Sequence, residues 1–147
     1  MKILSLYKWI AGSMIDFTSQ FKNNPALYNQ ARAYWNKLES SSAIILIIML
    51  VLGIAMAYMY YVPYNKQPGR RYTPKHWLYF LLGTFVLTFL VTWGYEYFAV
   101  PPKISGATWL QCRIALGNAI YASVLYFFVS IAWCNWGPTN AYRLFKI

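Results

Sequence analysis

The sequence predicts an all-α integral membrane protein with three transmembrane helices, at about 42–62, 77–100 and 111–136, preceded by an N-terminal amphipathic helix. Each of the three segments has the roughly 20 apolar residues that are needed to cross a hydrocarbon core. Apolar residues make up 59% of the 147 residues and charged residues only 11%, whereas about 25% of the residues in a soluble domain are charged. The chain has 13 Lys and Arg against three Asp and Glu. Most of these cations lie just outside the apolar segments, where anionic lipid head groups or acidic partner subunits are the expected counter-charges.

The first 21 residues carry an apolar stripe at the spacing of an α-helix, with polar residues opposite. We expect this amphipathic helix either to lie in the membrane interface or to dock on another protein, and a fourth span is the remaining alternative. Asn24 can cap a second helix and Pro25 fits its first position, so 25–38 reads as a lead-in to the first span. The chain then divides into an amphipathic and juxtamembrane region at 1–40 and a three-span domain with short basic loops at 41–147. The stripe comprises Ile3, Leu6, Tyr7, Ile10, Met14, Phe17 and Phe21.

The first span, 42–62, carries no charged residue. Gly53 and Ala57 are four positions apart, a spacing of small residues that allows a neighbouring helix backbone to approach closely. Tyrosines close the span as an aromatic belt, at Tyr58, Tyr60, Tyr61 and Tyr64.

The first loop, 63–76, is the most densely basic part of the chain. Under the positive-inside rule such a loop determines topology, and it is also a candidate site for an anionic phospholipid head group or an acidic partner loop. Its cations are Lys66, Arg70, Arg71 and Lys75.

The second and third spans each carry a ladder of small or polar residues, which predicts close helix packing or subunit contact. In the third span Asn118 is the polar group that we expect to hydrogen-bond to another helix. The second-span ladder is Thr84, Thr88, Thr92 and Glu96, and the third-span ladder is Ala115, Ala119 and Ser123.

The number of basic residues is equal on the two sides of the membrane. With three spans, six Lys and Arg residues fall on each side, and Arg113 is left within the third span. Cations in short loops next to a span weigh most, which favours an inside location for the first loop and the C-terminus.

The residue inventory argues against an enzyme and predicts no catalytic, cofactor or metal site. Paired-carboxylate catalysis needs two neighbouring acids, but only Glu96 of the three acids lies within a span, and His76 is the single histidine. Cys112 and Cys134 are separated by roughly 33 Å along one helix, too far for a disulfide. No glycine-rich phosphate loop or nucleic-acid-binding motif appears.

Glu96 and Arg113 are the charged residues within the spans, one on each side of the second loop. An ionisable residue within a span is a candidate functional site. The alternatives are that both side chains snorkel to the interface or pair with each other, that they contact another subunit or lipid, or that they take part in a proton or ion relay. A relay would need further polar residues along its path, which the spans lack, so an interfacial or paired arrangement is favoured.

These features favour a non-catalytic subunit that anchors or scaffolds a larger membrane complex, such as a secretion or transfer apparatus or a respiratory-type assembly. The expected partners are other membrane-protein subunits and anionic phospholipids, not nucleic acid. No cofactor is expected, although structural phospholipids are. One alternative is a homo-oligomeric channel lined by Asn118, the threonine ladder and Glu96, and another is a lipid-binding or lipid-sensing protein. A bacterial inner membrane is the favoured location, with the mitochondrial inner membrane as the alternative.

Overall fold

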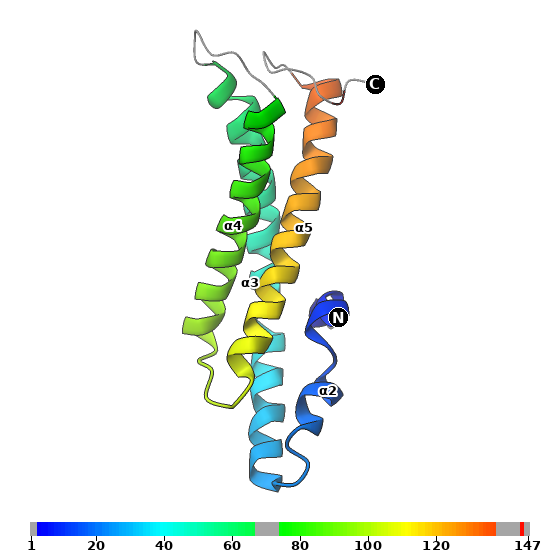
Figure 1. Ribbon diagram of the computed structural model, residues 1–147, viewed down its shortest axis with the longest axis vertical. Coiled ribbons are helices and arrows are strands. Elements are labelled where there is room, and N and C mark those ends of the chain that lie inside the picture. The colour runs from blue at the N-terminus through cyan, green and yellow to red at the C-terminus, as the bar shows by residue number, and fades with distance from the viewer. Residues whose placement is uncertain (1–2, 67–73, 138–144, 146–147) are drawn as a thin grey trace. The chain divides into compact units, whose positions relative to one another are not determined.

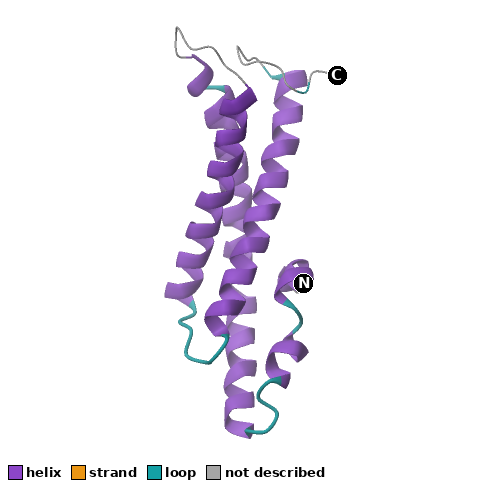
Figure 2. Ribbon diagram, viewed as in Figure 1, coloured by secondary structure: helices purple, strands orange, loops and turns teal. Residues whose placement is uncertain are grey.

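The computed structural model describes residues 3–66, 74–137 and 145, and within these residues it contains helices joined by loops and no strand (Figures 1 and 2). Three of the helices are long and apolar enough to cross a membrane. The elements in chain order are η1 (Ile3–Tyr7), α1 (Lys8–Ala11), α2 (Met14–Ser19), α3 (Pro25–Tyr61), η2 (Tyr64–Lys66), α4 (Pro74–Ala99) and α5 (Ala107–Trp136).

The three long helices match the predicted spans to within one residue at their C-terminal ends and extend beyond them at their N-terminal ends. The α3 helix merges the predicted lead-in with the first span into 37 continuous residues. It starts where expected, because the Asn24 side-chain oxygen accepts hydrogen bonds from the backbone N–H groups of Ala26 and Leu27. The α4 helix ends at Ala99, as a helix should before a proline pair.

The single amphipathic helix predicted over the first 21 residues is interrupted. Gly12 adopts a φ of +81°, a left-handed conformation that glycine tolerates and that ends α1. Ser13 then starts α2 with a capping box, in which Asp16 accepts hydrogen bonds from the Ser13 hydroxyl and backbone N–H at 2.6 Å and 2.7 Å. The local signals of glycine and the Ser-x-x-Asp cap therefore override the apolar stripe.

The chain groups into two compact units, and each unit takes a part of all three long helices. Unit 1 comprises Met1–Ile48 and Phe89–Asn118, and unit 2 comprises Met49–Thr88 and Ala119–Ile147. This grouping reflects packing, whereas the predicted division into 1–40 and 41–147 concerns position relative to a membrane, so that division stays a prediction.

In unit 1 the segments before α3 pack on the chain itself. Tyr7 is fully buried, and a Cβ atom placed on Gly117 of α5 would lie only 3.0 Å from the Tyr7 ring. The Phe17 ring lies 6.1 Å from the ring of Tyr34 and 6.2 Å from that of Trp35, both on α3. The buried side of the predicted stripe is thus covered by α3 and α5.

Unit 2 has an aromatic core around Tyr60, Tyr61 and Cys134. The Tyr61 hydroxyl and the Cys134 sulfur are 3.4 Å apart, and Tyr58 is exposed. Two tyrosines of the predicted aromatic belt therefore point into the protein. The partly buried residues that complete this core are Tyr64, Trp77, Phe80, Trp133 and Phe145.

Close helix packing in unit 2 is centred on Gly53. A Cβ atom at this position would lie 2.9 Å from Leu125 Cδ2 and 3.1 Å from the Ala122 carbonyl oxygen on α5. Ala57, one turn further along α3, is fully buried. The predicted pair of small residues is therefore used for packing within the chain.

Candidate functional site

The polar ladder of α4 faces the interior of the protein. Thr84, Thr88, Thr92 and Glu96 are all fully buried. The Thr84 hydroxyl donates to the carbonyl oxygen of Phe80, one turn earlier, a common way for threonine to satisfy its hydroxyl inside an apolar helix. The ladder is thus a buried face whose members differ in how their polar atoms are satisfied.

The α5 ladder is buried as well. Ala115, Asn118 and Ala119 are fully buried, and Ser123 is half-buried. The Ser123 hydroxyl donates to the Ala119 carbonyl oxygen at 2.9 Å. These predicted packing residues therefore have neighbours inside the chain, and contact with a second subunit is not needed to cover them.

Asn118 joins four elements of unit 1 through its side-chain amide. Its Nδ2 atom donates to the Ile45 carbonyl oxygen on α3 at 3.0 Å and to the Thr92 hydroxyl on α4 at 2.8 Å. Its Oδ1 atom accepts from the Tyr7 hydroxyl at 2.7 Å. The sequence indicated that Asn118 would bond across helices, but Tyr7 and Ile45 lie too far away along the chain to be identified as its partners.

Glu96 and Gln111 form a second polar centre in unit 1, and both are fully buried. The Gln111 Nε2 atom donates to the carbonyl oxygens of Glu96 and Val100, at 3.2 Å and 2.7 Å. Gln111 therefore satisfies carbonyls at the C-terminal end of α4, which would otherwise lack partners. Sequence reasoning missed Gln111 because a glutamine at the start of a span resembles an ordinary interfacial residue.

The side-chain oxygens of this centre lack hydrogen-bond partners. Both carboxyl oxygens of Glu96, the Gln111 Oε1 atom and the Tyr34 hydroxyl are buried without one. Tyr34 on α3 faces Gln111 and lies within electrostatic range of Glu96, although neither contact has hydrogen-bond geometry. Since buried polar groups are nearly always paired, this concentration of unpaired oxygens marks the most unusual chemistry in the described chain.

Arg113 lies apart from Glu96. Its side chain is exposed, with the guanidinium carbon 5.8 Å from the centre of the Trp109 ring. The paired arrangement considered for the two charged residues is not formed in this structure, because Glu96 faces the interior and Arg113 the surface.

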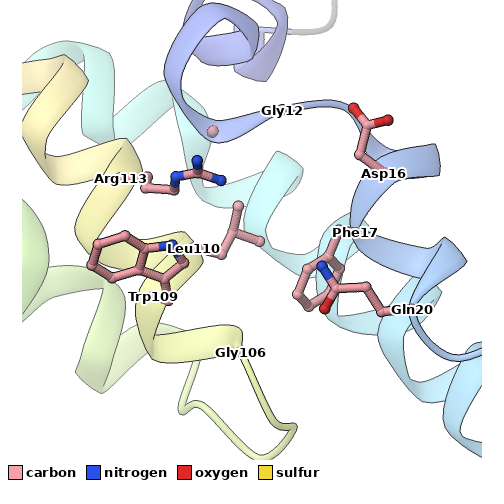
Figure 3. Close-up of a pocket in the computed structure, with 9 residues that line it drawn as sticks. Gly12, Asp16, Phe17, Gln20, Gly106, Trp109, Leu110 and Arg113 are labelled. Carbon is pink, nitrogen blue, oxygen red and sulfur yellow. The ribbon is translucent and has the colours of Figure 1, made fainter.

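Arg113 also lines a small pocket between the N-terminal segments and α5 (Figure 3). The pocket has a volume of about 110 Å³, well below the roughly 300 Å³ at which small-molecule sites begin. The Arg113 guanidinium group extends toward Gly12 (Figure 3). On the other side of the pocket, the Asp16 Oδ2 atom would lie 3.5 Å from a Cβ atom placed on Gly12. Hydrogen bonds from Ser13 hold the pKa of Asp16 below its ordinary value, with a smaller contribution from Lys8, so Asp16 is already engaged in its cap.

A larger pocket of about 460 Å³ lies between α3 and the loop that follows α4. Tyr34 and Val100 form part of its wall, and the exposed residues Lys37 and Lys103 also line it. The pocket is therefore adjacent to the Glu96 centre, because Tyr34 and Val100 belong to both.

The basic first loop is only partly within the described residues. Lys66 and Lys75 are exposed, and Arg70 and Arg71 lie outside the described residues. In the part of the chain that the structure describes, no group of three or more His, Cys, Asp or Glu side chains comes together as a metal site would require.

The chain matches no protein-family model, no curated protein and no solved structure.

Proposed function

We propose that this protein is a non-catalytic, membrane-spanning subunit that anchors a larger membrane complex, with a bacterial inner membrane as its favoured location. The observation that carries the proposal is the length of α3. Its 37 residues extend about 55 Å at 1.5 Å per residue, whereas the hydrocarbon core of a bilayer is about 30 Å thick. About 25 Å of unbroken helix thus remains for a role outside the hydrocarbon.

The part of α3 before the apolar run is folded and supported. Ala31 and Leu38 are fully buried, and Trp35 is 6% exposed. The Phe17 ring contacts the Trp35 ring from the preceding segments. A rigid helix that continues from a membrane span can fix the distance and orientation of a neighbouring subunit, as an anchor must.

The outer surfaces of the long helices are apolar, and α4 is the most exposed. In its most apolar stretch only 17% of the residues are buried, against 44% in α5. Leu82, Val86 and Leu90 are each 53% exposed. Such a face suits lipid or the apolar helices of other subunits.

The burial of the polar ladders supports an anchor over the channel alternative. A pore lined by Asn118 and Thr92 would require both side chains to face a lumen, whereas in this structure they hydrogen-bond to each other. A ring of this chain around such a pore would first have to break these internal bonds.

Site-specific photo-crosslinking in the native membrane tests the proposal. A photoreactive residue placed at Leu27 or Asn29, which are both exposed, should give a reproducible adduct with one unlike polypeptide. The matched control is Ala31, which is fully buried and should give only products within the chain. Adducts confined to lipid or to the same chain at Leu27 and Asn29 would contradict an anchoring role.

The lipid-binding alternative has its own test. Replacing Arg70 and Arg71 by Gln should abolish binding to anionic liposomes if the first loop is a head-group site. The control variant, with Arg32 and Lys37 replaced by Gln, removes the same charge from α3. Equal effects of the two variants would mean that net charge, and not the first loop, drives the binding.

A further inference from the structure

We propose that Glu96 is a proton-binding site that exchanges protons with water through the pocket between α3 and the α4–α5 loop, with Tyr34 placed between the carboxyl group and the pocket. The proposal goes beyond an anchoring role, because it assigns an internal ligand site to unit 1.

The site is built almost entirely from oxygen acceptors. The amide donor of Gln111 is already engaged with the Glu96 and Val100 carbonyls. Four side-chain oxygens are then left without partners, two of them on Glu96, and the Tyr34 hydroxyl supplies the single donor among them. An added hydrogen-bond donor is therefore what this centre lacks.

No cation neutralises Glu96 within the described residues. The titratable groups within electrostatic range are Tyr34 from α3 and Cys112 from α5, and neither is positively charged. Arg113 is exposed on α5 beside Trp109. Because an unpaired carboxylate is strongly disfavoured at a fully buried position, the group requires a positive occupant, and a proton bound to one carboxyl oxygen also provides the missing donor.

The neighbouring pocket gives this occupant a path to water. Tyr34 lines the pocket of about 460 Å³; its hydroxyl oxygen is buried, whereas the residue as a whole is 8% exposed. Val100, whose carbonyl oxygen holds Gln111, forms another part of the same wall. The hydroxyl of Tyr34 can accept a proton on one lone pair while donating its own, which suits it to relay between water and Glu96.

The charges around the pocket select a proton over a metal ion. Lys37 and Lys103 line it and are exposed. Two ammonium groups repel an incoming sodium or potassium ion, but they do not oppose proton exchange mediated by water or hydroxide. The oxygen-rich centre is thus better suited to protonation than to metal binding.

Infrared difference spectroscopy on the full chain in lipid nanodiscs tests the site. Because the chain has only three acidic side chains, the variant with Asp16→Asn and Glu39→Gln leaves Glu96 as its one side-chain carboxyl group. We expect a protonated carboxyl band that converts reversibly to carboxylate as the pH is raised. The band should disappear on adding Glu96→Gln, which mimics the neutral acid in size and shape.

A second measurement tests the path. Tyr34→Phe should slow deuterium exchange of the Glu96 proton, and Tyr28→Phe, on the same helix but outside the pocket wall, should not. Replacing sodium by choline at constant pH and ionic strength should leave the band unchanged. The proposal is overturned if Glu96 is ionised at every pH, if its band neither titrates nor exchanges, or if sodium displaces the proton. Should the double variant fail to fold, the difference between the wild-type spectrum and that of Glu96→Gln alone isolates the Glu96 band and gives the same decision.

Discussion

Substituting Gly53 by Ala should destabilise the protein, whereas the same change at Gly94 should not. The Cβ atom added at position 53 would lie 2.9 Å from Leu125 Cδ2 and 3.1 Å from the Ala122 carbonyl oxygen, whereas at Gly94 nothing lies within 4 Å of the new atom. Overpacking of this kind costs about 1–3 kcal/mol, and replacing glycine in a helix returns about 0.5–1 kcal/mol. We therefore expect Gly53→Ala to lower the free energy of unfolding by about 1–2 kcal/mol.

The paired variants can be compared by denaturant unfolding in detergent micelles, followed by circular dichroism. A loss of about 1.4 kcal/mol is a tenfold change in the unfolding equilibrium, which such a titration resolves. Gly94→Ala should be neutral or slightly stabilising. Equal stability of the two variants would refute the close packing of α3 on α5 in unit 2.

A double-variant cycle identifies the contact responsible. Leu125→Ala removes the nearest obstructing atom, so its cost should be smaller in the Gly53→Ala background than in the wild type, since residues in contact are not additive. Full additivity would show that the side chain of Leu125 is not what the added methyl group contacts.

Three further predictions concern the other contacts. Tyr7→Phe leaves Oδ1 of Asn118 without its donor and should weaken the docking of the segment before α3 by about 1–2 kcal/mol. Proteolysis of this segment should therefore become faster, and unchanged proteolysis would contradict the contact. Because the pKa of Asp16 is lowered, its cap stabilises α2 fully at pH values above the ordinary carboxyl pKa, and this stabilisation is lost as the pH falls through the lowered pKa. The amide chemical shifts of α2 should follow this acid transition, and Asp16→Asn should abolish it. Cys112 is half-buried and Cys134 buried, so maleimide should label Cys112 first in the folded protein, whereas equal rates would argue against the unit 2 core.

The sequence was informative where the signal is local. The long helices follow from runs of apolar residues, and the start of α3 follows from Asn24 and Pro25. The break at Gly12 was equally local, because Ser13 and Asp16 have the spacing of a capping box, but the apolar stripe across the whole segment obscured it.

The candidate site could be predicted only in part, because its contacts are non-local. Periodicity identified one face of α4 and placed Glu96 on it, but it did not indicate which helices cover that face. Gln111 is 15 residues from Glu96 along the chain, and Tyr34 belongs to a different helix. Such partners are set by how helices pack, which no single segment encodes.

The hydrogen bond between Tyr7 and Asn118 connects residues 111 positions apart, and this separation has a consequence for biosynthesis. The segment before α3 is made first, yet its buried partner on α5 emerges from the ribosome only after two long helices have been completed. Until then Tyr7 and its neighbours remain exposed to chaperones, lipid and proteases. The docking of this segment therefore reports that the third long helix has been completed and has packed, and a bulky fusion placed before the segment would interfere at that last step of assembly.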